Sequence, residues 1–508
     1  MTAPVHHAGG PSDPRELAGR TVLVAGAGIS GRSAARALTA LGASVTLVDD
    51  GAPGPGGAGK SQCGRVLGTA DAAAGVAGHA LVVTSPGWRP ANALAAAAVR
   101  AGVPLWGDVE LAWRLDRAQV YGPARRWLAV TGTNGKTTTT SMLHSILQAA
   151  GVASVACGNI GLPILDALAA ERRADVLAVE LSSFQLHWAP SVVPDAAVVL
   201  NIAEDHLDWH GGMDAYTRAK AQVLCGRVAV VGLDDPIASG LRGISTAGRT
   251  VGFRLGEPAP GELGVRGGML VDRAFGARRG DRAAQEDAAA HGEAVALVAA
   301  DRIEPGGSAG VLDALAAAAL ARAAGTGADA VAAGLAAHSA GPHRSAHVAT
   351  VAGVDYVDDS KATNPHAALA SIAGRRRVVW IAGGLLKGAS VEDLVAAVAP
   401  RLAGVVLIGR DRAVIADALV RHAPDVPVTE VAAGEDGEVT GSSSTSRTDA
   451  DAREGGVMDT VVSVAAEYAR AGDTVLLAPA AASMDMFRDY AERGDLFAAA
   501  VARLQPGG

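Results

Sequence analysis

A glycine-rich turn that joins an apolar strand to a helix is the feature that most limits the folds open to this chain. Residues 127–130 are predicted to form a strand, residues 131–138 read T-G-T-N-G-K-T-T, and a helix is predicted from there to about residue 150. The backbone N–H groups of such a turn hold phosphate oxygens, Lys136 neutralises phosphate charge, and Thr137 can ligate Mg²⁺. This segment therefore predicts an α/β unit that binds phosphate.

Length and composition bound the class of protein. The 508 residues predict about three domains. The net charge of −8 gives no basic surface for nucleic acid. Cys63, Cys157 and Cys225 lie far apart without a C-x-x-C pair, which argues against a disulfide framework or a thiolate zinc site and fits a reducing compartment. No signal peptide or membrane span is recognised, so we expect a cytoplasmic protein without nucleic-acid or membrane partners.

Strands that alternate with helices predict parallel α/β sheets along the chain. The expected domains are 1–122, 123–340 and 341–508. Two polar or low-complexity segments, 278–292 and 435–456, are expected to be insertions, the second of them disordered. The predicted strands are 21–25, 44–50, 81–85, 103–106, 127–130, 176–181, 196–201, 355–358, 378–382, 405–408 and 474–477.

A second glycine-rich turn, residues 26–31, follows the first predicted strand and opens a helix. Asp49 and Asp50 end the next strand about 20 residues later, which is the spacing of folds that bind a diphosphate at the turn and a ribose at the acid. Such a turn fits either a nicotinamide dinucleotide or a UDP compound. No His or Tyr constellation for hydride transfer accompanies it, which favours UDP. Residues 85–87, S-P-G, either line the same crevice or form a plain turn.

Polar side chains follow two further predicted strands. Residues 180–185 (E-L-S-S-F-Q) and 201–208 (N-I-A-E-D-H-L-D) place carboxylates and a histidine at strand ends, which suits Mg²⁺ held by oxygen ligands and one nitrogen. Of the 44 Lys and Arg residues only five are lysine, and four of these lie in motifs: Lys136, Lys220, Lys361 and Lys387. This retention indicates tasks that a guanidinium cannot perform.

Five motifs together resemble the Mur ligases of peptidoglycan synthesis. They are residues 131–138, 180–185, 201–208, the P-H-R of 342–344 and the D-S-K-A-T-N of 359–364. The resemblance extends from about residue 20 to about residue 500. The phosphate loop is shared by all Mur ligases and by folylpolyglutamate synthases, whereas D-S-K-A-T-N is typical of the branch that adds D-glutamate.

The resemblance implies an α/β fold of three domains. An N-terminal Rossmann-like domain would bind the UDP substrate, and a central P-loop ATPase-like parallel sheet would bind ATP. A C-terminal Rossmann-like domain would bind the amino acid and close on ATP. The implied enzyme is bacterial, cytoplasmic and monomeric. It would use ATP to join D-glutamate to UDP-N-acetylmuramoyl-L-alanine through an acyl phosphate and a tetrahedral intermediate.

The resemblance also implies roles for individual residues. The ATP-binding residues would be Gly132, Thr133, Asn134, Gly135, Lys136, Thr137, Thr138, Asp313, Arg344 and Asp359. The residues that bind the UDP substrate would be Gly28, Ile29, Ser30, Asp49, Ser85, Pro86, Gly87, Asn159, Ser182, Gln185 and His206. The residues that bind D-glutamate would be Arg344, Lys361, Thr363, Lys387, Ser483, Met484 and Tyr490.

Metal binding and catalysis are implied in the same way. Two Mg²⁺ ions would be held by Thr137, Glu180, His206 and a carbamylated Lys220. The catalytic residues would be Lys136, His206, Lys220 and Lys361. The alternative for Lys220 is an ordinary lysine on the surface of a helix.

The chain departs from the family pattern at a few positions. Val130 stands where a phosphate loop often has its first glycine, and Ala309-Gly310 stands where the family has a His-Asn pair, with Asp313 at the following Asn position. The turn at 383–388 lacks an acid and an extra glycine before Lys387.

Three alternatives stay open at this point. A nicotinamide dehydrogenase is supported by residues 26–31 and 49–50. A non-catalytic nucleotide-binding regulator is supported by residues 309–310. A sister ligase would use another amino acid as acceptor.

Overall fold

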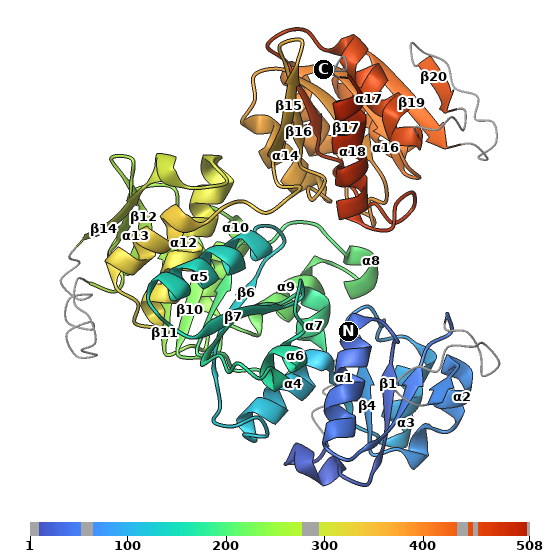
Figure 1. The fold of residues 1–508 in the computed structure, drawn as a ribbon, viewed down its shortest axis with the longest axis vertical. Coiled ribbons are helices and arrows are strands. Elements are labelled where there is room, and N and C mark those ends of the chain that lie inside the picture. Colours follow the sequence, from blue (N-terminus) through green and yellow to red (C-terminus); the bar gives the residue numbers. More distant parts are fainter. Residues whose placement is uncertain (1–9, 52–64, 277–293, 434–445, 451–455, 505–508) are drawn as a thin grey trace. The chain divides into compact units, whose positions relative to one another are not determined.

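The computed structural model describes residues 10–51, 65–276, 294–433, 446–450 and 456–504. The chain divides into two compact units, one of residues 1–202 and 214–338 and the other of residues 203–213 and 339–508. The described residues form three sheets, one within each expected domain (Figure 1). The α/β architecture of three domains is therefore confirmed, while the domain boundaries stay predictions. The expected insertion at 278–292 lies entirely outside the described residues.

The first sheet is five-stranded and parallel throughout, in the order β3-β2-β1-β4-β5. Its strands are β1 (Thr21–Ala25), β2 (Ser44–Val48), β3 (Arg65–Leu67), β4 (Leu81–Thr84) and β5 (Leu105–Gly107), and its helices are α1 (Ile29–Ala40), α2 (Thr69–Ala74), α3 (Ala93–Ala101) and α4 (Asp108–Arg117). The strand order reverses beside β1, so the crevice for a ligand opens at the carboxyl end of β1, where the turn 26–31 lies.

The central sheet has nine strands in the order β14-β13-β12-β11-β10-β9-β6-β8-β7. Its strands are β6 (Arg126–Thr131), β7 (Ser154–Gly158), β8 (Val176–Glu180), β9 (Ala196–Val199), β10 (Val228–Gly232), β11 (Arg249–Phe253), β12 (Glu262–Arg266), β13 (Met269–Asp272) and β14 (Val295–Ala299). The strands from β7 to β12 are parallel, and β13 and β14 add antiparallel strands. The carboxyl ends of β6, β8 and β9 therefore lie at one edge, as the predicted site requires.

An alanine-rich helix forms the layer beneath the phosphate loop. α12 (Gly307–Ala323) packs against α5 (Lys136–Ala149) and against strands β9 to β12. Residues 314–321 of α12 are completely buried. A helix that is apolar on all sides belongs in the interior of a domain, and the small alanine side chains let it approach its neighbours closely. α13 (Ala328–Ala337) approaches α5 as closely, since a Cβ on Gly334 would lie 2.3 Å from Ile146 Cα.

The third sheet has seven strands in the order β15-β16-β21-β17-β18-β19-β20. They are β15 (Ala346–Val351), β16 (Val354–Asp358), β17 (Val378–Gly383), β18 (Leu402–Ile408), β19 (Val428–Ala433), β20 (Ser446–Ala450) and β21 (Thr474–Leu477). β15 pairs antiparallel with β16, and the other pairs are parallel. The helices are α14 (Pro365–Ala373), α15 (Glu392–Val398), α16 (Arg412–His422), α17 (Gly456–Tyr468) and α18 (Tyr490–Leu504).

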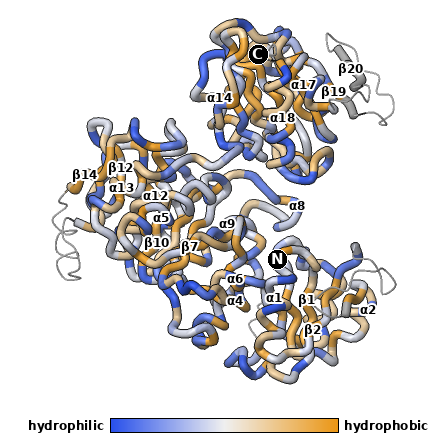
Figure 2. Tube along the Cα trace, viewed as in Figure 1, coloured by the Kyte–Doolittle hydropathy of each residue, from blue (hydrophilic) through white to orange (hydrophobic). Residues whose placement is uncertain are grey.

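Both faces of this third sheet are buried. Val378 and Trp380 pack into the core on one face, whereas Val379 and Ile381 pack into the core on the other. Strands buried on both faces are continuously apolar, and Figure 2 shows the strands of this sheet largely in orange. The expectation of disorder across 435–456 is wrong for residues 446–450, which form β20 by parallel pairing with β19, and α17 begins at Gly456.

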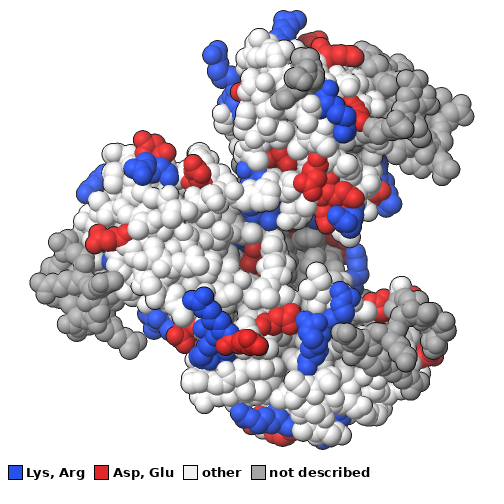
Figure 3. Space-filling model, in the orientation of Figure 1, with Lys and Arg blue, Asp and Glu red and all other residues white. Residues whose placement is uncertain are grey.

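The surface carries both signs of charge. On the face drawn in Figure 3, Lys and Arg side chains are interspersed with Asp and Glu side chains. Among the described helices, none has both the length and the apolar character needed to span a membrane.

Candidate active site

The phosphate loop between β6 and α5 depends on two glycines. Gly132 has a φ of 153° and Gly135 a φ of 84°, which residues with a side chain rarely adopt. A Cβ on Gly132 would lie 2.9 Å from Leu200 Cβ, and one on Gly135 would lie 2.1 Å from Asp313 Oδ1. Lys136 begins α5, so the loop ends at a helix N-terminus, where backbone N–H groups favour an anion. The predicted order of strand, turn and helix is confirmed.

Asn201 holds the loop from the end of β9, the strand beside β6. Its backbone carbonyl accepts a hydrogen bond from Thr133 N (2.9 Å), and its side-chain Oδ1 accepts one from Asn134 N (2.9 Å). Its Nδ2 donates to Asn134 O at 3.2 Å. Sequence reasoning included Asn201 within a motif but gave it no role. The available signal was an amide side chain directly after a buried strand.

Two lysine amines converge on one carbonyl of the loop. Lys136 Nζ donates to Gly132 O at 2.9 Å and to Thr133 O at 2.7 Å. Lys220 Nζ, from α9 (Met213–Ala221), donates to Gly132 O at 2.8 Å. Lys220 is 1% exposed, and its Nζ lies 4.7 Å from the centre of the Tyr216 ring. The alternative of an ordinary surface lysine at 220 is therefore wrong.

Glu180 lies at the end of β8, at the same edge of the sheet. It is 2% exposed, and its Oε1 accepts a hydrogen bond from Asn159 Nδ2 at 2.9 Å. A Cβ on Gly158 would lie 2.2 Å from Glu180 O, so glycine is required for β7 and β8 to approach at this point. The structure thus brings Asn159 and Glu180 together, both of which were candidate site residues.

Ser182 and Gln185 form a capping box at the start of α7 (Ser183–His187). Ser182 Oγ accepts from Gln185 N at 3.2 Å, and Gln185 Oε1 accepts from Ser182 N at 3.0 Å. These contacts satisfy backbone groups at the N-terminus of the helix. Gln185 and Ser30, from the N-terminal glycine turn, also act on the carboxyl group of Asp108, where both oppose the rise in pKa that burial causes.

Asp313 lies directly below the phosphate loop. It is buried, and its Oδ1 accepts a hydrogen bond from Thr139 Oγ1 at 3.1 Å. The side chain therefore supports the first turns of α5. Packing also accounts for the departure at 310, since a Cβ on Gly310 would lie 1.7 Å from Pro305 O. An asparagine at this position requires the backbone of Pro305 to move.

The two acids after β2 have different contacts. Asp49 Oδ2 accepts from Ala27 N at 2.7 Å, so this carboxylate holds the N-terminal glycine turn. Asp50 accepts from Thr69 N and Thr69 Oγ1 at 2.7 and 2.6 Å, and these hydrogen bonds lower the pKa of Asp50. Asp49, the candidate, is the acid at the turn, whereas Asp50 caps α2.

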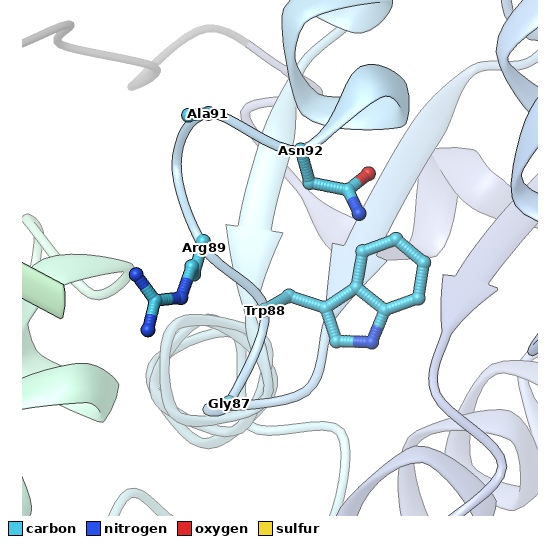
Figure 4. A pocket seen from close by; sticks show the side chains of 5 residues that line it. All are labelled: Gly87, Trp88, Arg89, Ala91 and Asn92. Atoms are coloured by element: carbon cyan, nitrogen blue, oxygen red, sulfur yellow. The ribbon is translucent and has the colours of Figure 1, made fainter.

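A pocket of about 430 Å³ adjoins the candidate residues 85–87 (Figure 4). Gly87, Trp88, Arg89, Ala91 and Asn92 line it, and the side chains of Trp88 and Arg89 leave the loop in opposite directions. Within the described part of the chain, Ser85 Oγ is buried without a hydrogen-bond partner. Ile29 on the neighbouring turn is 68% exposed. A buried hydroxyl without a partner close to a pocket is typical of a ligand site.

The second unit brings several candidates for D-glutamate binding together. Lys361 Nζ lies 5.0 Å from the centre of the Tyr490 ring, and Thr363 N donates to Lys361 O at 2.9 Å. Ser483 is buried and Met484 is 76% exposed. Asp359, a candidate for ATP binding, accepts from Ser345 N at 3.1 Å, and burial raises its pKa.

A buried arginine supports this group. Arg493 on α18 is fully buried, and it donates to Ser360 Oγ at 3.0 Å, to Ser360 O at 2.8 Å and to Ala481 O at 3.2 Å. Burial lowers the pKa of Arg493 to about 10. Sequence reasoning did not single out Arg493, because a buried arginine cannot be told from a surface one by its position in a helix.

His206 and Lys387 belong to the second unit and share one acidic neighbour. Lys387 Nζ lies 3.5 Å from Asp205 Oδ1, and His206 Nε2 lies 3.4 Å from Asp205 Oδ2. His206 and Lys387 have φ of 55° and 54°. Thr137, Glu180 and Lys220 belong to the first unit.

No group of three or more His, Cys, Asp and Glu side chains in the described ranges is placed to hold a metal ion. The expected Mg²⁺ ligands include a threonine and a carbamylated lysine, and neither is one of these four residue types. The metal site stays a prediction.

Comparison with known proteins identifies the family. The Mur ligase middle domain matches residues 130–259. The UDP-N-acetylmuramoylalanine–D-glutamate ligase of Rhodococcus jostii is 59% identical to the chain over 505 residues, with 96% of each chain covered. The protein of the same name from Nocardia farcinica is 58% identical over 491 residues, with 97% of this chain and 98% of its own covered.

A solved structure shares the fold. The UDP-N-acetylmuramate-alanine ligase MurC of Thermotoga maritima has a TM-score of 0.53 at 16% identity, with 96% of this chain and 100% of that chain covered. The three sheets, the phosphate loop with its two lysines and the identity over nearly the full length agree with one another. The chain belongs to the UDP-N-acetylmuramoylalanine–D-glutamate ligase family of Mur ligases.

Proposed function

We propose that the chain uses ATP to join D-glutamate to UDP-N-acetylmuramoyl-L-alanine in peptidoglycan precursor synthesis. The observation that carries the proposal is the phosphate loop, with the amines of Lys136 and Lys220 at the carbonyl of Gly132. The names of relatives at 55–59% identity support the choice of substrates.

The reaction has to make a carboxylate reactive, because its charge and resonance both oppose attack by an amine. An oxygen of the L-alanyl carboxylate attacks the γ-phosphorus of ATP, which gives an acyl phosphate and releases ADP. The neutral amine of D-glutamate then attacks the acyl carbon to form a tetrahedral intermediate. The nitrogen loses a proton, phosphate leaves with the electron pair of the C–O bond, and an amide remains. Lys136 and the loop N–H groups offset charge on the transferring phosphoryl group.

Mg²⁺ fits the donor atoms around the loop. The hydroxyl of Thr137 and the carboxylate of Glu180 are the hard oxygen ligands that Mg²⁺ prefers, and the family resemblance implies His206 as a nitrogen ligand. The buried Glu180 has a neutral amide at its Oε1, and a buried carboxylate is stabilised by a cation. When bound, Mg²⁺ offsets the charge of the phosphates. Lys220 would add an anionic oxygen ligand after its neutral amine takes up CO₂ and loses a proton.

The substrates are assigned to the sites by their chemistry. The turn 26–31, Asp49 and the pocket beside Gly87 suit the UDP portion, since backbone N–H groups bind a diphosphate and an acid binds ribose hydroxyls. The two carboxylates of D-glutamate need cationic and hydroxyl partners, which Lys361, Lys387 and Ser483 provide. We propose that the remaining candidate residues act as the family resemblance implies.

Phosphate release tests the proposal. The full-length protein would be incubated with ATP, Mg²⁺ and UDP-N-acetylmuramoyl-L-alanine, and D-glutamate would be compared with L-glutamate, L-alanine and a diamino acid. Release with D-glutamate alone is expected. Release with another amino acid would move the protein to a sister activity. No release with any of them, together with ATP binding, would favour a non-catalytic regulator.

A further inference from the structure

The turn that carries Arg344 has an unusual backbone. His343 and Ser345, the residues on either side of Arg344, have φ of 61° and 47°. Residues with a side chain adopt positive φ rarely and at a cost in free energy that surrounding contacts must offset. Two such residues around a single arginine indicate that the turn is held in place by its neighbours.

Two consecutive carboxylates at the end of β16 hold the two sides of this turn. Asp358 Oδ2 accepts a hydrogen bond from His343 Nδ1 at 2.6 Å. Asp359 Oδ1 accepts one from Ser345 N at 3.1 Å. Lys361 N also donates to His343 O at 3.3 Å. The segment that contains D-S-K-A-T-N therefore fixes the residues before and after Arg344.

The contact between Asp358 and His343 is enclosed. The two residues are 3% and 8% exposed, and α18 covers them. A Cβ on Gly494 of α18 would lie 2.1 Å from His343 Nδ1 and 2.6 Å from Asp358 Oδ2. Asp358 Oδ1 also accepts from Ser360 N at 2.9 Å. A hydrogen bond to a carboxylate shielded from water is expected to be strong, and the distance of 2.6 Å is short.

We propose that Asp358 is a positioning residue that, through His343, fixes the turn presenting Arg344 to the nucleotide. The inference rests on the proposed function, in which Arg344 contacts ATP and D-glutamate. Ordering a long arginine side chain on binding costs entropy. A turn that is fixed on both sides removes the backbone part of that cost before ATP arrives. If Asp358 only stabilised the fold, its loss would not raise the KM for one substrate more than the KM for another.

The chain offers a matched control on the same strand. Asp355 of β16 also faces a histidine, His347 Nε2 at 3.6 Å, but the two side chains are 55% and 57% exposed. Asp355→Ala and Asp358→Ala remove the same group from an aspartate–histidine pair. Only the second change removes a contact that holds the turn at Arg344.

Steady-state kinetics separate positioning from general damage. Asp358→Ala is expected to raise the KM for ATP about tenfold, the order of one lost hydrogen bond to a charged group. The KM for UDP-N-acetylmuramoyl-L-alanine is expected to stay within about twofold of wild type, because Arg344 is not among the residues proposed to bind that substrate. Asp355→Ala is expected to change neither value. An equal rise in both KM values, or equal values for the two variants, would overturn the inference.

A double variant tests whether Asp358 acts through Arg344. Adding Asp358→Ala to Arg344→Ala is expected to change the KM for ATP no further, because the side chain that the turn presents is already gone. A full additional loss in that background would show that Asp358 acts by another route and would overturn the inference.

Two further variants keep the test decisive if Asp358→Ala does not fold. Asp358→Asn retains an oxygen that accepts from His343 and is expected to stay within about threefold of wild type. Gly494→Ala forces the pair apart while both partners remain, so it is expected to raise the KM for ATP as Asp358→Ala does. An unchanged KM in Gly494→Ala would overturn the inference.

The failure of the proposed function has a different signature. If wild type releases no phosphate with D-glutamate, the function fails whatever the variants do. Calorimetry with a non-hydrolysable ATP analogue then decides the positioning role, because weaker binding in Asp358→Ala than in Asp355→Ala supports it and equal binding overturns it.

Discussion

Replacing Asp108 with asparagine is expected to make the protein more stable at neutral pH. Asp108 begins α4, and burial raises the pKa of its carboxyl group to about 6 from an ordinary value of 3.8, although hydrogen bonds from Val109, Gln185 and Ser30 oppose the rise. One pKa unit corresponds to about 1.4 kcal/mol. Ionisation of Asp108 therefore costs the folded state about 3 kcal/mol relative to the unfolded chain.

The sign of the pH dependence follows from this rise. The folded protein binds the Asp108 proton more tightly than the unfolded chain does. Protonation of Asp108 therefore stabilises the fold fully below about pH 4, and this stabilisation is lost as the pH rises through about 6. Asparagine cannot ionise, and it keeps an oxygen that accepts hydrogen bonds. The Asp108→Asn variant should therefore exceed wild type by up to about 3 kcal/mol at pH 8, and the two should converge near pH 4.

Unfolding in urea at several pH values measures this difference. Tryptophan fluorescence follows the unfolding, and two of the seven tryptophans, Trp106 on β5 and Trp113 on α4, are buried near Asp108. Asp116→Asn is the control on the same helix. Asp116 is fully buried and pairs with Arg125 at 3.1 Å, so its loss should destabilise the protein at neutral pH. A less stable Asp108→Asn variant at pH 8, or a difference that does not shrink toward pH 4, would refute the reasoning.

Three more outcomes are expected. Lys220→Ala should lose most phosphate release and regain part of it with added acetate. Arg218→Ala removes an exposed charge from the same helix and should keep the wild-type rate. Full activity of Lys220→Ala without acetate would contradict the carbamate. Asn201→Ala should raise the KM for ATP about tenfold in steady-state kinetics, because Asn134 of the phosphate loop loses its hydrogen bonds to the Asn201 side chain. The KM for D-glutamate should stay unchanged. Arg493→Met should lower the free energy of unfolding of the second unit, measured in urea, by about 3 kcal/mol, because buried oxygens of Ser360 and Ala481 lose their hydrogen-bond donor. A loss below about 1 kcal/mol would contradict this role of Arg493.

Local pattern was enough for much of the fold. The glycine turns at 26–31 and 131–138 were predictable because each is a continuous strand, turn and helix, and the structure has β1 with α1 and β6 with α5 at these places. β20 was not predictable, because S-R-T-D-A has no apolar alternation and becomes a strand only by pairing with β19. β13 and β14 are also short strands whose antiparallel pairing depends on neighbours along the sheet.

The candidate site was predictable in its residue types more than in its contacts. The retained lysines marked Lys136 and Lys220, whose amines meet at Gly132. The different contacts of Asp49 and Asp50 depend on the position of Thr69 and could not be read from two adjacent acids. The pairing of Asp358 with His343 depends on how α18 closes over the end of β16, which no local pattern encodes.

The alanine-rich helix α12 has a mechanical consequence for the phosphate loop. Alanine has no side-chain torsion that can switch to another rotamer, so the alanines of α12 leave the layer beneath the loop few ways to absorb a displacement by repacking. A displacement of α5 on phosphate binding is therefore expected to shift α12, which packs against it. The floor of the nucleotide site is therefore stiff by composition, and the loop keeps the shape that fits phosphate before any phosphate binds.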